Sequence, residues 1–314
     1  MFKKTVLATS VALGMGMAGA AQADLFLFNP AGTGAAGAVT GALIDQAPGN
    51  DLAINGVAGG GAPLPVGTTI NNLYQSNLNS INNVANVPVF SQGTGGFFFT
   101  FVAGFTETVV AASSGGGTST NSFSVNPGGF FKICAQGAGA NDAAGTGFSC
   151  AGNGILSGHV LSGNATQTVF VGSGATPLDQ SPNGDQRAPT LTLTSSGAAN
   201  LTLQVDTVNA GYFPDLFTGA AFVVSMTNTS NITPFAQVDP SLVFSINGIA
   251  NGGTADNIGA INGLTGPNFQ FQADANSSLT RIAVPEPATL SLLGLGLFGL
   301  GAALRRRTKL SNVH

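Results

Sequence analysis

FFFTFVAGFTETVVAA, residues 97–112, carries the clearest strand pattern in the chain. Its first half is almost continuously apolar, which is typical of a buried strand. Its second half alternates apolar and polar residues, which is typical of a strand with one buried face and one solvent-exposed face. This stretch therefore predicts a strand at the centre of a sheet.

The segments that follow repeat this pattern. SFSVNPGGFFKICAQG, residues 122–137, places Pro-Gly-Gly between two strand-like runs, which predicts a hairpin. Apolar residues two apart also occur in five later segments, at 158–172, 188–207, 220–230, 241–248 and 268–275. We therefore expect one buried face along a series of short strands.

The predicted fold class is all-β. Gly is about twice as frequent as usual, at 46 of 314 residues, and Asn, Thr and Ser are also abundant, as expected for short strands joined by turns. No repeat of fixed period is found, which argues against a solenoid or propeller. We expect residues 96–283 to form a β-sandwich of the jelly-roll or immunoglobulin-like kind.

Residues 24–95 form a Gly/Asn-rich N-terminal segment that we expect to be partly strand, beginning with LFLF at 25–28. Within it, TTINNLYQSNLNSINNVANVPVF, residues 68–90, has four apolar residues at near-helical spacing, Leu73, Leu78, Ile81 and Val84. A helix is an open alternative there, although Asn is a poor helix former.

The chain has two cysteines, Cys134 and Cys150, and they are predicted to form a disulfide. The closed loop of 17 residues would be worth about 3 kcal/mol in the loop-entropy model. The alternative, a metal or redox pair, lacks a Cys-x-x-Cys spacing and neighbouring histidines.

Both termini carry signals for export. Lys3 and Lys4 precede an apolar run, and Ala21-Gln22-Ala23 supplies the small residues of a cleavage site, so residues 1–23 are predicted to be a signal peptide. Between Asp24 and Val284 the chain has three basic and twelve acidic residues, a net charge of −9. Such a body is not expected to bind nucleic acid or anionic lipid.

VPEPATLSLLGLGLFGLGAALRRRTKL, residues 284–310, predicts a membrane anchor near the other end. Residues 288–304 are uncharged, and a helix of that length reaches roughly 25 Å, enough to just span a bilayer. The basic cluster of Arg305, Arg306 and Arg307 would hold its end on the cytoplasmic side of the inner membrane. A buried core helix is the alternative, but prolines precede the run and arginines follow it directly.

Pro285-Glu286-Pro287, an apolar run and an Arg-rich end, in that order, resemble the PEP-CTERM sorting signal of Gram-negative bacteria. The resemblance covers residues 284–310 and implies recognition by an exosortase, a membrane-bound cysteine transpeptidase, in cells that also make exopolysaccharide. The inner membrane would hold the precursor only transiently. Gln272 to Ser278 is similar to a run in flocculation-associated PEP-CTERM proteins, which implies a role in exopolysaccharide-dependent flocs or biofilm.

Little in the sequence suggests catalysis, so we expect no enzyme activity and no cofactor. His159 is the only exported histidine, and Ala151 replaces the last glycine of a Gly-x-Ser-x-Gly motif. Glu107 is the only glutamate outside the sorting motif, so paired carboxylates would have to come from scattered aspartates. Asp179 and Asp185 lie in a Gly-containing turn that a cation could occupy, although we expect no metal site there.

Three functions remain open at this stage. The first is a structural or adhesive protein of the cell surface and extracellular matrix that contacts exopolysaccharide. The second is a specific carbohydrate-binding module that stacks sugars on Tyr74 and Tyr212. The third, least favoured, is a hydrolase with scattered aspartates.

Overall fold

A computed structural model of the chain describes residues 24–56, 58, 61–142, 145–148, 150, 154–170, 176–177, 191–192, 194–216, 222–233, 243–244, 256–257 and 268–281. The chain divides into two units, residues 1–281 and 282–314, and every described residue belongs to the first.

The described residues form an all-β fold, as the sequence predicts. One turn of 3-10 helix, η2 (Thr94–Gly96), lies entirely within them. The strands are β1 (Phe26–Phe28), β2 (Val39–Gly41), β3 (Leu43–Gln46), β4 (Gly49–Ile54), β5 (Thr69–Asn82), β6 (Pro88–Ser91), β7 (Phe98–Gly115), β8 (Thr118–Val125), β9 (Gly128–Gln136), β10 (Gly154–Phe170), β11 (Thr176–Pro177), β12 (Leu191–Thr192), β13 (Thr194–Val208), β14 (Phe222–Thr233), β15 (Val243–Phe244), β16 (Asp256–Asn257) and β17 (Phe269–Arg281).

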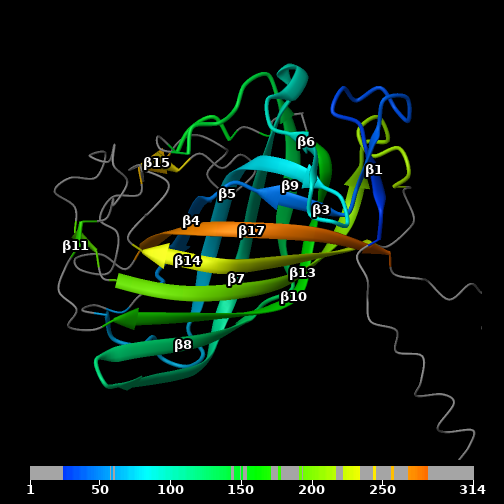
Figure 1. The fold of residues 1–314 in the computed structure, drawn as a ribbon. Coiled ribbons are helices and arrows are strands. Elements are labelled where there is room, and N and C mark those ends of the chain that lie inside the picture. The colour runs from blue at the N-terminus through cyan, green and yellow to red at the C-terminus, as the bar shows by residue number, and fades with distance from the viewer. Residues whose placement is uncertain are drawn as a thin grey trace, which may run out of the picture. The chain divides into compact units, whose positions relative to one another are not determined.

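The main sheet closes on itself. Around the sheet, each strand pairs antiparallel with the next, in the order β5, β7, then β8 and β9 together, β10, β13, β14 and β17. β17 then pairs with both β3 and β4. These two strands pair with β5, which completes the circle. In Figure 1, β8, β10, β13, β14 and β17 lie side by side, with β5, β7 and β9 crossing behind them. The predicted β-sandwich is therefore wrong for these residues: they form one closed sheet, not two stacked ones. The alternating sequence pattern could not distinguish a sandwich from a closed sheet, because each strand has one buried face in either fold.

The predicted hairpin at Pro-Gly-Gly is also wrong. β8 and β9 both pair antiparallel with β7, β8 with Glu107–Gly115 and β9 with Phe98–Gly104, so they form one interrupted strand. At the interruption the Asn126 N–H donates to the Thr106 carbonyl oxygen at 2.9 Å, and Gly128 and Gly129 have φ of 108° and 69°. The extra residues form a bulge and do not reverse the chain, because Asn126 keeps its bond to β7.

Residues 24–95 supply strands to this same sheet. β3 and β4 form a second interrupted strand between β5 and β17, with a break at Ala47 and Pro48. The segment for which a helix was an open alternative is the 14-residue strand β5. Its near-helical spacing of apolar residues arises because both faces of β5 are largely buried.

Aromatic side chains fill much of the interior of the sheet. The Phe28 ring lies 5.2 to 5.5 Å from the rings of Phe90, Phe99 and Phe213, in edge and tilted arrangements. Further along β7, Phe101 lies 5.8 Å from the Tyr74 ring. These fully or almost fully buried rings leave the interior packed rather than open.

Among the described residues, we find no helix long and apolar enough to cross a membrane. The predicted helix at 288–304 and the predicted signal peptide at 1–23 lie outside the described residues and stay predictions.

Candidate functional site

Three polar side chains lie together inside the closed sheet, on neighbouring strands. They are Asp51 of β4, Asn72 of β5 and Glu107 of β7, and each is at most 5 % exposed. Asn72 pairs with Ala53, two residues from Asp51, and Glu107 pairs with Ile70, two residues from Asn72. Each polar side chain is thus a diagonal neighbour of the next, within reach across the sheet. We call Asp51, Asn72 and Glu107 the interior acid cluster.

The interior acid cluster lines a cavity of about 30 Å³, which is space for one or two water molecules. Most of the remaining lining is apolar. The apolar part of the lining comes from Ala53, Ile70, Phe105, Phe123, Ala165, Ala199 and Phe271. The further polar residues of the lining are Thr166, Gln167 and Ser195.

Burial dominates the electrostatics of this cluster. Loss of solvation raises the pKa of Asp51 well above its ordinary value, and the charge of Glu107 raises it further. Burial likewise raises the pKa of Glu107 to about 7, while a hydrogen bond with the Asn72 side chain opposes the rise. No Lys, Arg or His is among the described residues that line the cavity.

Two oxygen atoms of the cluster have no hydrogen-bond partner, Oδ1 of Asp51 and Oδ1 of Asn72. Buried polar atoms are rarely left unpaired, so these two set the cluster apart from the rest of its apolar surroundings. Our reading of the sequence missed this cluster. A signal was available, because Phe105, Glu107 and Val109 share one face of the alternating strand, and a carboxyl group among apolar neighbours is unusual.

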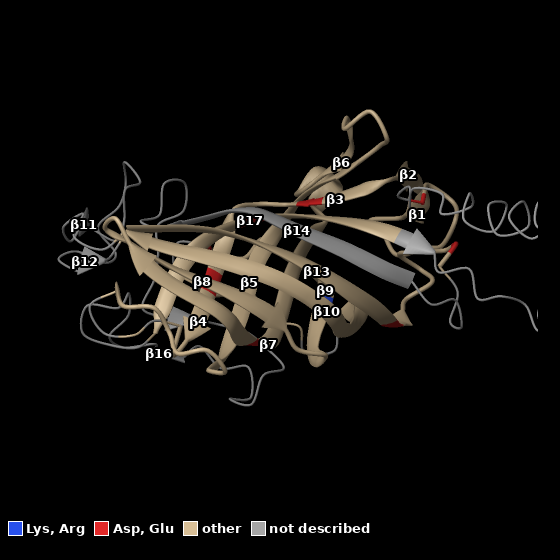
Figure 2. Cartoon of the chain, turned by 90° about the horizontal axis from the view of Figure 1, so that it is seen from below, with Lys and Arg blue, Asp and Glu red and all other residues tan. Residues whose placement is uncertain are grey.

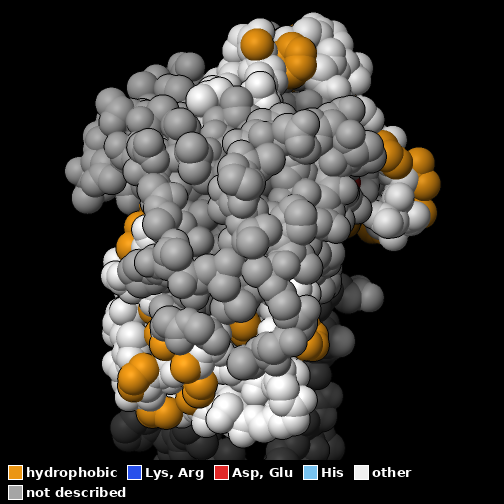
Figure 3. Space-filling view, turned by 90° about the vertical axis from the view of Figure 1, so that its left-hand side faces the viewer, with side chains coloured by type: hydrophobic (Ala, Val, Ile, Leu, Met, Phe, Trp, Pro, Cys, Tyr) orange, Lys and Arg blue, Asp and Glu red, His pale blue; other side chains and the backbone are white. Residues whose placement is uncertain are grey.

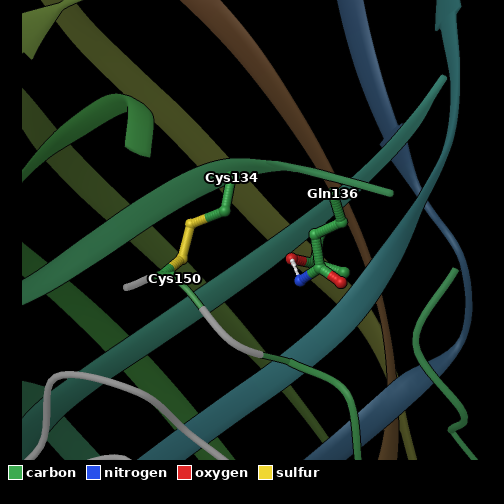
Figure 4. The surroundings of a disulfide bond; sticks show 4 residues. Cys134, Gln136 and Cys150 are labelled. Carbon is green, nitrogen blue, oxygen red and sulfur yellow. Dashed lines mark hydrogen bonds between the residues drawn. A yellow bond between two sulfur atoms is a disulfide. The ribbon is translucent and has the colours of Figure 1, made fainter. Parts of the chain in front are cut away.

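The predicted disulfide joins Cys134 of β9 to Cys150, with the two Cα atoms 5.5 Å apart. Figure 4 shows it beside Gln136, whose side-chain amide donates to the Thr100 hydroxyl at 2.7 Å. The sulfurs pack on the outer face of the sheet with Leu52, Val102 and Phe148. The disulfide therefore holds the loop after β9 against the sheet.

Polar contacts anchor the same loop. The Asn77 side chain accepts a bond from the Ala140 N–H at 2.9 Å and donates to the Ala140 carbonyl oxygen and the Asp142 carboxylate. Asn50 donates to the Asp142 carbonyl oxygen at 2.8 Å. Burial raises the pKa of Asp142 to about 6, against the opposing bonds from Asn77.

His159 lies on the outside of β10, where its Nδ1 is 2.7 Å from the Asp206 carboxylate. The nearby hydroxyl of Ser157 bonds to Thr207. Within the described residues, no serine or cysteine is hydrogen-bonded to the other ring nitrogen of His159, so the pair lacks the third member of a hydrolase triad.

Tyr74 is fully buried inside the sheet, so its ring cannot stack on a sugar at the surface. Tyr212 is partly exposed and packs edge-on against Phe99, with ring centres 6.0 Å apart. The structure does not bring these two tyrosines together as an outer binding platform.

Uncharged polar side chains cover the outside of β8, β10 and β13. We call this surface the polar face. All its residues are at least partly exposed, and they are Thr118, Thr120, Ser122, Ser124, Asn164, Thr168, Ser196, Asn200, Thr202 and Gln204. Thr168 lies between Thr120 and Ser196 on the neighbouring strands, and Asn164 lies between Ser124 and Asn200.

Charge is sparse over the described surface. Figure 2 shows scattered red positions and little blue, with Lys132 on β9. In the face drawn in Figure 3, the described atoms are almost all white or orange. No group of three or more His, Cys, Asp or Glu side chains suited to a metal ion occurs within the described residues.

Several predicted site residues lie outside the described residues. These are the cleavage residues Ala21 and Ala23, the turn aspartates Asp179 and Asp185, the sorting residues Pro285, Glu286 and Pro287, and the basic residues Arg305, Arg306 and Arg307.

Comparison with protein families finds a sorting motif near the C-terminus. The PEP-CTERM protein-sorting motif matches residues 283–307, which confirms the resemblance seen in the sequence. The chain therefore carries a PEP-CTERM sorting motif, and this motif indicates exosortase-dependent sorting to the cell surface. Membership of the flocculation-associated group is not confirmed. No curated protein and no solved structure matches the chain significantly.

Proposed function

We propose that this protein is a non-catalytic structural or adhesive component of the cell surface and extracellular matrix, and that its polar face contacts exopolysaccharide. The observation that carries the proposal is the ladder of hydroxyl and amide groups across β8, β10 and β13, combined with the sorting motif. Such groups donate and accept hydrogen bonds without attracting or repelling charge.

The geometry of the polar face supports contact with an extended polymer. The Thr120 and Thr168 hydroxyls are 3.0 Å apart, so the side chains lie in ordered cross-strand rows. Each contact with a sugar hydroxyl exchanges a bond with water for a bond with the sugar, so each adds little affinity. Many weak contacts along one chain of sugars would add up by avidity.

The test uses the host strain and measures how much protein stays with the exopolysaccharide. Asn164→Ala combined with Asn200→Ala should lower co-sedimentation with washed exopolysaccharide several-fold and slow the settling of cell aggregates. Asn71→Ala on the exposed side of β5 is the matched control and should behave as wild type. Equal retention of all three proteins would contradict the role of the polar face.

We also propose that the precursor is anchored transiently in the inner membrane through residues 288–304, until an exosortase processes it at Pro285-Glu286-Pro287. Mass spectrometry of the mature C-terminus should find the segment after this motif removed in wild-type cells and retained in a strain without the exosortase. An intact C-terminus in both strains would overturn this part of the proposal.

A further inference from the structure

We propose that the interior acid cluster binds one hard divalent cation of the calcium type. The cation would lie in the cavity between β4, β5 and β7 and take oxygen ligands from Asp51, Asn72 and Glu107. This site is separate from the polar face and does not depend on the function proposed above.

The chemistry of the three side chains fits such an ion. Two carboxylates and one amide oxygen are the donors that Ca²⁺ prefers, and no nitrogen or sulfur ligand accompanies them in the described lining. Two carboxylates offer up to four oxygens and Asn72 a fifth, and the cavity has space for about one water beside the ion. This approaches the six to eight oxygens that Ca²⁺ takes.

The unpaired atoms point to the same conclusion. Asn72 is 4 % exposed and its Oδ1 has no partner, although the side chain lines the cavity. Oδ1 of Asp51 is unpaired as well. A cation would satisfy both oxygens at once, whereas a bridging water would leave two buried acid groups without a counter-charge.

Charge balance gives a third argument. The described lining has two acidic groups and no basic one, so the cavity can hold two negative charges only at a high desolvation cost. A divalent ion neutralises both charges.

The cavity is near one end of the closed sheet. Glu107 pairs with Ile70, the second residue of β5, and Thr69 before it is exposed. The cluster is therefore close to the end of the sheet at which β5 begins.

The first experiment is calorimetric titration of the full chain, purified in detergent and stripped of metal, with CaCl₂ at pH 8. We expect saturable binding of one ion per chain in the submillimolar range. Asp51→Asn combined with Glu107→Gln should weaken it at least tenfold, whereas Asp206→Asn, which removes an exposed carboxylate, should leave it unchanged. No saturable binding up to about 10 mM, a range that covers weak extracellular sites, would overturn the proposal, as would wild-type binding in the double variant.

A second measurement does not depend on the folding of the acid variants. Tyr74 pairs with Asp51 and the chain has no Trp, so a bound Tb³⁺ ion should show luminescence sensitised by Tyr74. CaCl₂ should displace the signal, Tyr74→Phe should abolish it, and Tyr212→Phe should retain it. A signal that depends on Tyr212 instead would place the ion elsewhere and refute the assignment.

Discussion

Phe269, the first residue of β17, pairs with Ala53 of β4, and this pairing helps to close the sheet between its early strands and its last strand. The first strands of the fold are thus as necessary to the closure as the last. Without β3 and β4, one side of β5 and one side of β17 would be left as open edges.

A chain that lacks residues 24–67 should therefore not fold, although more than two thirds of the strands remain. We expect aggregation and loss of a cooperative thermal transition, because the unpaired edges of β5 and β17 are free to pair with other chains. A chain that lacks only residues 1–23 should melt cooperatively. Cooperative melting of the shorter chain would show that closure is dispensable.

The stability of the chain should fall as the pH rises from about 4 to above 7, in the presence of a metal chelator. Glu107 and Asp142 have folded-state pKa values of about 7 and about 6, above their ordinary values, so the folded state binds more protons than the unfolded state in this range. Their contribution is complete below the unfolded pKa values and is lost as pH passes the folded ones. Thermal melts at pH 4, 6 and 8 measure this loss of stability. A melting temperature that rises with pH would contradict the prediction.

Glu107→Gln should stabilise the metal-free chain at pH 8 and change little at pH 4. Glutamine has nearly the shape of the protonated acid and never carries the buried charge, a difference on the order of 3 kcal/mol at high pH. Denaturant titration at both pH values tests this. The exposed Asp206→Asn should show no comparable pH-dependent gain.

Replacing Cys134 and Cys150 with serine should lower the free energy of unfolding by about 3 kcal/mol. Both residues are buried, at 0 % and 6 % exposed, so some packing is lost as well. Urea melts of the double variant, compared with wild type under oxidising and reducing conditions, measure the effect. If reduction alters wild type and leaves the variant unchanged, the loss belongs to the disulfide.

Gly129→Ala should destabilise the chain by about 2 kcal/mol or more. Gly129 has φ of 69°, and a Cβ there would clash with the carbonyl oxygen of Gly104 on β7. Gly116 has φ of 58° and open space around it, so Gly116→Ala is a control that measures only the cost of a positive φ for alanine. Equal losses in the two variants would mean that contact with β7 is unimportant.

The strands were largely predictable from the sequence, because alternating apolar residues directly report a buried face. Their arrangement was not. Pro127 and the two glycines after it have the composition of a tight turn, and only the pairing of Phe130 with Gly104 shows that the strand continues past them. Similarly, no feature of the sequence near Ala53 indicates that this residue pairs with Phe269, which comes more than two hundred residues later.

The interior acid cluster was hidden for a related reason. Asp51 and Glu107 are distant in sequence, so nothing local shows that their side chains lie near each other inside the sheet. The disulfide could be predicted without knowing how the strands are arranged, because two cysteines can pair in only one way. The sorting motif was recognised because its three parts are contiguous.

The sorting motif begins two positions after the end of β17, so any tension on the tail reaches the sheet through Arg281. That strand is bonded to β14 on one side and to β3 and β4 on the other, with bonds that lie across its direction. A pull along β17 loads these bonds together in shear rather than one after another, so the sheet would resist extraction of this strand.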